Sequence, residues 1–437
     1  MHRRLPYVLA VAVAILATAA VAVGSGLLVI PAASPSGLAP ASFAPTSPPP
    51  PSPTLEPTPA PPSPTPRLRS SIERYGITDR LQRALEEGRA ALAAPGIQAS
   101  VLFADGRQWS GTAGVADLAT GRRLTTDTPF AIASVSKTFL AAAILLLVDE
   151  GRVGLDDPAA PLLAGTLVGG EPVDPRITIR MLLDHTSGLR DYLVSPSLDR
   201  AVRGAPAAVW TPDQALAYAG RPVAPPGKGY HYANTNYVLL GRIVERLTGR
   251  SLAAELRARF FDPLRLRSVS YQGFEPPTAE LPTAYRYTSA RLDARPQDVT
   301  DGSDIRPFTA ITTATGAAGS IAASAHDLAR WARALYGGGI LPRELLAEMV
   351  ADADSVMALE PPYPYGLGVQ VFEVDGRVTY GHSGRLVGAR TILRWLPEDR
   401  IAIAITTNQS RFDTTPLLRA LLAIVAPDHT GGGQRPA

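Results

Sequence analysis

Apolar residues recur at helical spacing where the folded part of the chain begins. Within residues 72–94, Leu81, Ala84 and Leu92 mark one face and charged residues occupy the other. This spacing predicts an amphipathic helix. The run IQASVLF at 97–103 then predicts a strand, and the glycines that follow it predict further short strands.

The most apolar part of the folded region covers residues 134–150. It has no charged residue from Thr138 through Val148 and is apolar nearly all round. A helix with this composition is expected to be buried on all sides. Gly151 follows it directly, in the place where a glycine commonly ends a helix.

Strand-like runs return near the C-terminus. They cover residues 365–374, 377–384, 389–397 and 400–409. Short turns, such as the one at Pro397, Glu398 and Asp399, separate them, and a last helix is expected over about 413–425. Consecutive strands joined by short turns predict an antiparallel sheet.

The middle of the chain, from about 156 to 310, mixes helical segments with proline-rich connections. One clear helix has apolar residues at i, i+3, i+4 and i+7, namely Leu240, Ile243, Val244 and Leu247. Later, Ser324 with Asp327 three residues on is typical of a helix start. We therefore expect an α+β fold, in which helices flank an antiparallel sheet and a mostly helical subdomain is inserted.

The first 33 residues carry a targeting segment. His2, Arg3 and Arg4 form a basic head, and residues 5–33 contain no charge. About 20 apolar residues suffice to cross a bilayer, whereas the apolar part of a cleaved signal has only about 7–15. We expect an uncleaved single-span anchor with the rest of the chain outside the cytoplasm. A long cleaved signal, and hence a secreted protein, is the alternative.

A proline-rich stretch separates this segment from the folded domain. Residues 34–66 contain 14 prolines in 33 positions, a composition that favours a disordered, extended linker. At about 3.1 Å per residue it could reach roughly 100 Å. The domain is expected over 67–427, and residues 428–437 are expected to be a disordered tail.

Charge and composition exclude several functions. The net charge is only +3, whereas a nucleic-acid-binding protein is expected to carry a basic stripe. Cysteine is absent, which excludes disulfides, thiolate metal sites and a cysteine nucleophile. The six histidines are scattered, so neither a metal nor another cofactor is expected. The oligomeric state is left open.

Lysine occurs only twice, at Lys137 and Lys228, while the other 40 basic residues are arginine. Lys137 lies three residues after Ser134, on the same face of the predicted helix, and the helix N-terminus favours developing negative charge at Ser134. A serine hydroxyl needs a base to become nucleophilic. Lysine can be that base when burial lowers its pKa, and arginine cannot.

Ser136 is a weaker candidate because it points about 100° away from Lys137. The alternative is an accidental S-x-x-K.

Two further motifs carry candidate chemistry. Tyr232 and Asn234 precede a predicted helix; the phenol could relay protons, and the amide could orient a substrate carbonyl or hold the lysine. His382, Ser383 and Gly384 end a predicted strand, which we take to be an edge strand where substrate backbone could lie close, with His382 donating a hydrogen bond or proton. The alternatives are a packed tyrosine with a capping asparagine, and an ordinary bend with an exposed histidine.

Other motifs are less promising. The stretch GHSGR differs from the G-x-S-x-G elbow, because Arg385 occupies the last glycine position. His185, in LLDHTSGL, could suggest a Ser/His pair, but a single histidine beside a turn is more often structural.

The three ordered motifs, Ser134 to Lys137, Tyr232 to Asn234 and His382 to Gly384, resemble the serine beta-lactamase-like hydrolases of the class C type over about residues 70–425. This superfamily includes class C beta-lactamases, DD-peptidases, D-aminopeptidases and related esterases. The resemblance implies a beta-lactamase/transpeptidase-like fold and hydrolysis through an acyl-enzyme. It implies as substrate a peptidoglycan-type peptide, a D-amino-acid amide, an ester or a beta-lactam. A penicillin-binding protein that does not turn over is the alternative.

The resemblance also implies roles for individual residues. Ser134 would be the nucleophile, and Lys137 and Tyr232 would act as the base or its relay. Asn234 would contact the acyl group, and His382 would line the opposite wall of the site. The backbone N–H groups of Ser134 and Arg385 would form the oxyanion hole. One departure matters, since class C enzymes usually have Lys-Thr-Gly where this chain has His382, Ser383 and Gly384. These residues are expected to hold a substrate carboxylate less well, and the Arg385 side chain is a hypothetical substitute.

Overall fold

The structure is a computed structural model that describes residues 66–289, 291, 294–351, 356–357, 363–411 and 413–426. The predicted anchor at 1–33 and tail at 428–437 lie outside these residues and stay predictions. So does the linker predicted at 34–66, except for its last residue, Pro66, which begins a helix. None of the helices in the described part combines the length and the apolar content that crossing a membrane would require.

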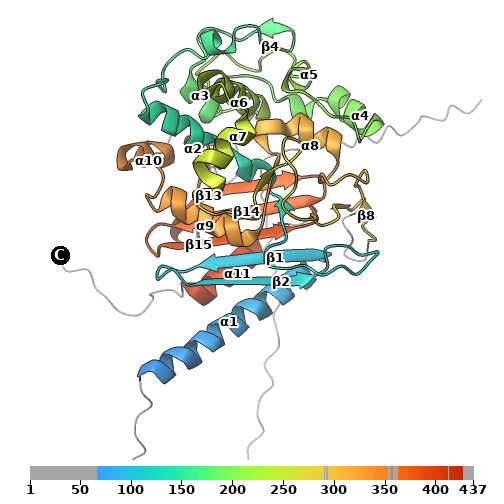
Figure 1. Cartoon of the computed structure of the whole chain (residues 1–437), viewed down its shortest axis with the longest axis vertical. Coiled ribbons are helices and arrows are strands. Elements are labelled where there is room, and N and C mark those ends of the chain that lie inside the picture. The colour runs from blue at the N-terminus through green and yellow to red at the C-terminus, as the bar shows by residue number, and fades with distance from the viewer. Residues whose placement is uncertain are drawn as a thin grey trace, which may run out of the picture.

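A six-stranded sheet forms the base of the domain, and every neighbouring pair in it is antiparallel, as predicted. Its order is β12 (Gln370–Val374), β13 (Arg377–Leu386), β14 (Ala389–Leu396), β15 (Ile401–Thr407), β1 (Gly96–Leu102) and β2 (Gln108–Gly114). Strands β1 and β15 are buried along their whole length. The two ends of the folded region therefore build one sheet, visible across the middle of Figure 1.

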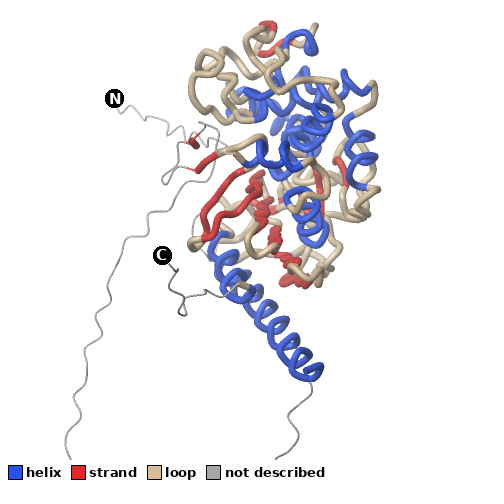
Figure 2. The backbone as a smooth tube through the Cα atoms, turned by 90° about the vertical axis from the view of Figure 1, so that its left-hand side faces the viewer, coloured by secondary structure: helices blue, strands red, loops and turns tan. Residues whose placement is uncertain are grey.

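Helices cover both faces of this sheet. On one face, α1 (Pro66–Ala91) and α11 (Thr415–Val425) bury Leu81 and Leu421 against the sheet. On the other face, α9 (Ala325–Tyr336) contacts β1, β14 and β15. Helix α1 begins six residues before its predicted start, because proline is well suited to the first turn of a helix, and Figure 2 shows it projecting beyond the sheet.

Apart from α9, the residues between β2 and β12 form the helical part of the domain, in the upper half of Figure 1. Its helices are α2 (Ser136–Asp149), α3 (Ile179–Leu183), α4 (Pro196–Gly204), α5 (Pro212–Leu216), α6 (Asn234–Thr248), α7 (Leu252–Leu256), α8 (Thr309–Thr315) and α10 (Arg343–Val350). Its tighter or wider turns are η1 (Ala133–Val135), η2 (Ala160–Leu163), η3 (Tyr192–Val194), η4 (Arg257–Phe261) and η5 (Gly316–Ala318). The inserted subdomain is mostly helical, as predicted.

Short strands stiffen this part. They are β3 (Phe130–Ala131), β4 (Leu167–Val168), β5 (Glu171–Pro172), β6 (Ser270–Tyr271), β7 (Tyr285–Arg286), β8 (Gln297–Asp298), β9 (Ile321–Ala323), β10 (Val356–Met357) and β11 (Tyr363–Pro364). Three of them, β3, β9 and β6, pair into a small sheet. Strand β3 leads directly into η1 and so helps to place the turn that begins α2.

Helix α2 is the centre of the larger core, as its composition predicts. Eleven of its 14 residues are buried, and the Phe139 ring stacks on Trp331 of α9 with ring centroids 3.9 Å apart. Gly151 follows the helix with a φ of 67°, the left-handed conformation expected of a glycine beyond a helix end. Lys137 is therefore carried by a helix that is packed within the apolar core.

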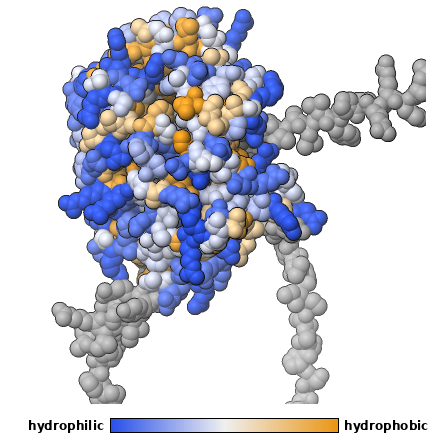
Figure 3. All heavy atoms as spheres, turned by 45° about the vertical axis from the view of Figure 1, so that its right-hand side comes forward, coloured by the Kyte–Doolittle hydropathy of each residue, from blue (hydrophilic) through white to orange (hydrophobic). Residues whose placement is uncertain are grey.

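The face of the molecule in Figure 3 is largely hydrophilic. On the face in Figure 3, apolar residues form small separate groups among hydrophilic ones. Among the residues that the structure describes, the most exposed large apolar side chain is that of Val209, at 70%. Single exposed apolar residues are normal in globular proteins and do not by themselves indicate a binding surface.

Candidate active site

Ser134 lies in the short turn η1, and the α-helix proper begins two residues later, at Ser136. The preceding residue, Ala133, has a φ of 48°, a left-handed conformation that is uncommon for a residue with a β-carbon. Strain of this kind is often found beside functional groups. Ser136, the weaker candidate, is buried and its Oγ accepts the Ile321 N–H.

Lys137 is completely buried, and its Nζ has three hydrogen-bond partners. They are Ser134 Oγ at 3.1 Å, Asn234 Oδ1 at 2.7 Å and Ala318 O at 2.8 Å. Two of these, Asn234 Oδ1 and Ala318 O, can only accept, so a neutral amine would direct its lone pair at Ser134. Burial lowers the pKa of Lys137 to about 7, although the negative charge of Asp191 opposes this shift. The lysine is thus poised to accept a proton.

Tyr232 approaches Ser134 from the loop before α6. Its hydroxyl donates to Ser134 Oγ at 2.9 Å, and burial raises the pKa of Tyr232 well above its usual value. The ring lies against His185, with centroids 4.2 Å apart. His185 Nδ1 accepts the Ala233 N–H at 3.2 Å, so this histidine supports the Tyr232 loop, which agrees with its structural interpretation.

Asn234 is the first residue of α6 and connects Lys137 to a carboxylate. Its Oδ1 accepts from Lys137, and its Nδ2 donates to Asp191 Oδ2 at 2.9 Å. The buried Asp191 also accepts the Leu193 N–H at 3.0 Å. Burial raises the pKa of Asp191 to about 6. Of the two sequence-based suggestions for Asn234, the geometry matches the one in which the amide holds the lysine.

The third motif lies on β13. We predicted an edge strand here, and this prediction is wrong, because β12 pairs with β13. That pairing reaches only from Arg377 to Gly381. Beyond Gly381, β13 continues beside β14 alone among the described strands. The edge character is therefore confined to the half of β13 that contains the motif.

His382 is not the exposed histidine of an ordinary bend, which was the alternative interpretation of this motif. It is 1% exposed, its Nδ1 donates to Ser383 O at 2.7 Å, and its Nε2 accepts from the Tyr365 hydroxyl at 3.0 Å. Burial lowers the pKa of His382 well below its ordinary value, and the Lys137 charge adds to this effect. The ring is neutral, and both nitrogens already have partners within the protein.

Ser383 is held by a buried network that the sequence did not reveal. Its Oγ accepts from Arg394 Nη2 at 3.1 Å, and its N–H donates to Gln370 Oε1 at 2.8 Å. Arg394 is fully buried, and its guanidinium carbon Cζ lies 4.1 Å from the centroid of the Phe372 ring. Since Arg394 is a donor, the Ser383 hydroxyl directs its own hydrogen elsewhere.

Gly384 brings the third motif against the segment that precedes Ser134. A β-carbon at residue 384 would lie 2.0 Å from Ile132 O and 3.3 Å from Ala133 Cβ. Because N–H groups alternate along a strand and the Ser383 N–H faces Gln370, the Arg385 N–H points to the same side, away from β14. The Arg385 side chain is exposed.

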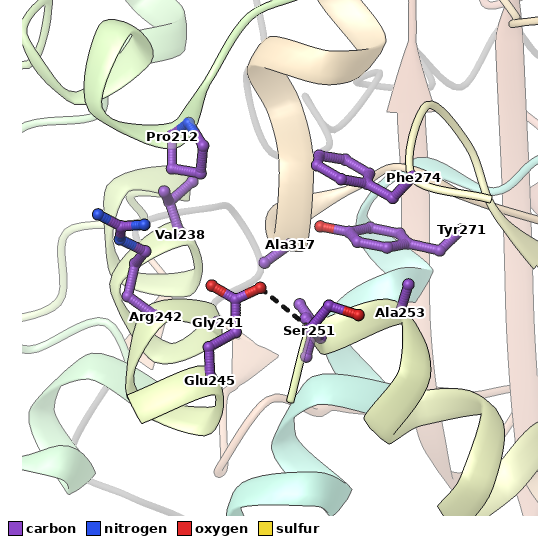
Figure 4. A pocket seen from close by; sticks show the side chains of 11 residues that line it. Pro212, Val238, Gly241, Arg242, Glu245, Ser251, Ala253, Tyr271, Phe274 and Ala317 are labelled. Atoms are coloured by element: carbon purple, nitrogen blue, oxygen red, sulfur yellow. Dashed lines mark hydrogen bonds between the residues drawn. The ribbon is translucent and has the colours of Figure 1, made fainter. Parts of the chain in front are cut away.

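The described residues contain no group of three His, Asp or Glu side chains placed to bind a metal. A cavity of about 110 Å³ lies beside α6 and is lined by Tyr271, Phe274 and Ala317, among others (Figure 4). Its acidic group, Glu245, accepts the Leu252 N–H at 3.0 Å. Neither Ser134 nor Lys137 lines it, so the chemistry lies elsewhere.

Comparison with known proteins agrees with this geometry. The family model described as Beta-lactamase matches residues 81–426. The chain is 32% identical to penicillin-binding protein 4 of Amycolatopsis lactamdurans, over 75% of this chain and 85% of that protein. It is 31% identical to a D-aminopeptidase of Brucella canis, over 68% of this chain, but spans only 52% of that relative.

Solved structures share the fold. A D-stereospecific amidohydrolase from a Streptomyces species aligns with a TM-score of 0.67 and 30% identity, over 80% of this chain and 99% of that one. A D-amino acid amidase from Ochrobactrum anthropi SV3, complexed with D-phenylalanine, aligns with a TM-score of 0.68 at 22% identity, over 80% and 99% of the two chains. The second likeness concerns the fold alone. The match over residues 81–426 establishes that the chain belongs to the beta-lactamase family of serine hydrolases.

Proposed function

We propose that the protein hydrolyses D-amino-acid amides or short D-amino-acid peptides through an acyl-enzyme on Ser134. The observation that carries this proposal is the buried Lys137, whose Nζ lies 3.1 Å from Ser134 Oγ while its other two partners are acceptors. The relatives named D-aminopeptidase and D-stereospecific amidohydrolase support the choice of substrate.

Each residue of the site has its own role in the proposed reaction. Ser134 Oγ attacks the substrate carbonyl carbon while Lys137 Nζ takes its proton. The Arg385 and Ser134 N–H groups stabilise the oxyanion, an interaction that typically contributes a few kcal/mol. Tyr232, a neutral phenol, passes its proton to the leaving nitrogen as the C–N bond breaks, and the proton held by Lys137 replaces it. Water then attacks the ester carbonyl carbon while Lys137 takes its proton, and the bond to Ser134 Oγ breaks as Lys137 returns that proton to Oγ.

The third motif favours substrates without a free carboxylate beside the scissile bond. His382 is neutral, and its two ring nitrogens bond to Ser383 O and to the Tyr365 hydroxyl. It therefore brings no positive charge to bind such a group. Amides and esters should be better substrates than peptides that end in D-Ala-D-Ala.

A panel of substrates tests this choice. We expect turnover of D-alanine amide and D-phenylalanine amide, with kcat/KM at least about tenfold above that for an acetylated D-Ala-D-Ala peptide; a bound carboxylate would require the missing charge. The Ser134→Ala protein provides the blank. The reverse preference, lost in Arg385→Ala, would show that the Arg385 side chain binds the carboxylate.

A penicillin-binding protein without turnover is the second candidate, because the chain is 32% identical to penicillin-binding protein 4. Fluorescent penicillin distinguishes the two. Stable labelling of Ser134, with no hydrolysis of any amide, ester or lactam in the panel, would favour this second function.

The pH dependence follows from the lysine. With the pKa of Lys137 near 7, kcat/KM should rise about tenfold per pH unit below pH 7 and level off above it, because only the neutral amine accepts the serine proton. Hydrolysis of p-nitrophenyl acetate between pH 5 and pH 9, corrected for the Ser134→Ala blank, measures this limb. A flat profile across pH 6–8 would contradict the assignment of Lys137 as the base.

We also infer that the enzyme works outside the cytoplasm, tethered by residues 1–33 through the linker at 34–66. The basic head and the uncharged stretch of 29 residues support this inference. Fractionation of cells that make the full chain tests it. Recovery of the protein in the medium with a new N-terminus near residue 34 would instead establish a cleaved signal.

A further inference from the structure

We propose that Asp191 is a positioning residue for the Ser134–Lys137 pair, acting through the Asn234 amide. This inference rests on the proposed function and deepens it. The carboxylate fixes which end of the amide faces the lysine, and its charge balances the ammonium that forms when Ser134 gives up its proton.

The hydrogen bonds form a chain with one direction. An ionised carboxylate only accepts, so Asp191 Oδ2 requires the Asn234 Nδ2 donor, which lies 2.9 Å away. This orientation leaves Asn234 Oδ1 facing Lys137 Nζ at 2.7 Å. Without the carboxylate, the amide could rotate and present Nδ2 to the lysine. Donor would then face donor, and Lys137 would lose one of the acceptors that fix its position.

Asp191 is itself fixed on both sides. Its Oδ1 accepts the Leu193 N–H at 3.0 Å, and the next residue, Tyr192, donates its N–H to Thr235 Oγ1 at 3.2 Å. Thr235 Oγ1 in turn donates to Arg190 O at 2.6 Å. The segment that carries Asp191 is therefore fastened to the first turn of α6, where Asn234 is located.

The charge around Lys137 gives Asp191 an electrostatic role as well. From the loop before α6 and from α6 itself, the Tyr232 and Tyr237 rings lie 5.1 and 5.2 Å from Nζ. His185 from the loop after α3 and His382 from β13 both have pKa values lowered by burial and by the Lys137 charge.

Beyond His382, Arg394 of β14 adds positive charge and further lowers the pKa of His382. Asp191 is the group that raises the pKa of Lys137 against burial. An ionised carboxylate near a buried ammonium stabilises the protonated lysine. Removing the Asp191 charge should therefore lower the pKa of Lys137. The neutral amine would then form at lower pH, but it would accept the Ser134 proton less readily.

The test measures the nucleophilic reactivity of Ser134 without using the proposed substrates. A fluorescent fluorophosphonate reacts as Ser134 Oγ bonds to phosphorus, fluoride leaves, and the serine proton passes to Lys137. We compare the labelling rate between pH 5 and pH 9 for the parent, Asp191→Asn, Asp191→Glu and Asp184→Asn. Asp184 is a matched control, because it is a buried carboxylate of the same segment that accepts from Thr186.

In Asp191→Asn, we expect the labelling rate at pH 8 to fall by roughly 10- to 100-fold, and the acid limb to move to lower pH by roughly half a unit to one unit. Asp191→Glu should keep the limb at the parent position, and Asp184→Asn should change neither quantity by more than about twofold. Melting temperatures of all four proteins report stability separately.

Two outcomes would overturn the proposal. The first is an unshifted acid limb in Asp191→Asn, with a rate loss no larger than that of Asp184→Asn. The second is a limb that moves to higher pH. A parent protein that is not labelled at all contradicts the proposed function instead, so the two failures are distinguishable.

Discussion

Replacing Lys137 with arginine is expected to lower kcat/KM for p-nitrophenyl acetate by about 10³-fold, since positioned bases typically contribute about 10²- to 10⁴-fold. Arginine keeps a positive charge at this position but cannot accept the Ser134 proton. It must also fit a planar, longer group between Asn234 Oδ1 and Ala318 O, which lie 2.7 and 2.8 Å from Nζ. Steady-state kinetics at pH 8 measure the loss.

The chain contains its own matched control for this experiment. Lys228 is the other lysine and is exposed, so Lys228→Arg should leave kcat/KM within about twofold of the parent. Lys137→Met separates charge from chemistry, because it removes the base without inserting a guanidinium. Activity of Lys137→Arg within tenfold of the parent, with a similar melting temperature, would mean that another group takes the serine proton.

The sequence was sufficient to predict the parts of the site that depend on local spacing. Ser134 and Lys137 are three residues apart in one helical segment, and their side chains meet at 3.1 Å. The lysine stood out because the chain otherwise uses arginine. The antiparallel sheet and the buried α2 followed from hydrophobic periodicity, which depends on neighbours along the chain.

The features of the site that the sequence did not predict depend on contacts between residues far apart in the chain. Asp191 reaches Asn234 across 43 residues, and its local sequence is that of an ordinary turn. The partners of His382 could not be foreseen either, because Tyr365 lies 17 residues earlier in the chain and meets it only in the folded structure. Whether a histidine is exposed and able to donate, or buried and neutral, is decided by such tertiary contacts.

Glycine at position 384 is expected to be essential, because β13 closely approaches the segment before Ser134 at this residue. In Gly384→Ala, the new β-carbon would lie 2.0 Å from Ile132 O, so β13 or the segment before Ser134 must shift by roughly 1 Å. A displacement of that size in an active site can cost about 10²-fold in rate. We expect kcat/KM to fall at least about 100-fold, with a destabilisation of about 1–3 kcal/mol, as for other overpacked sites. Kinetics and urea unfolding measure the two effects.

The control is a glycine with free space around it. A β-carbon at Gly204, at the end of α4, meets nothing within 4 Å, so Gly204→Ala should retain the parent activity and stability. The two alanine variants add the same methyl group and differ only in what it touches. If Gly384→Ala kept kcat/KM within threefold of the parent, the packing of β13 on Ile132 would not set the position of Ser134. The Arg385 N–H, which is carried by the next residue, would then have to reach the oxyanion by some other arrangement of the two segments.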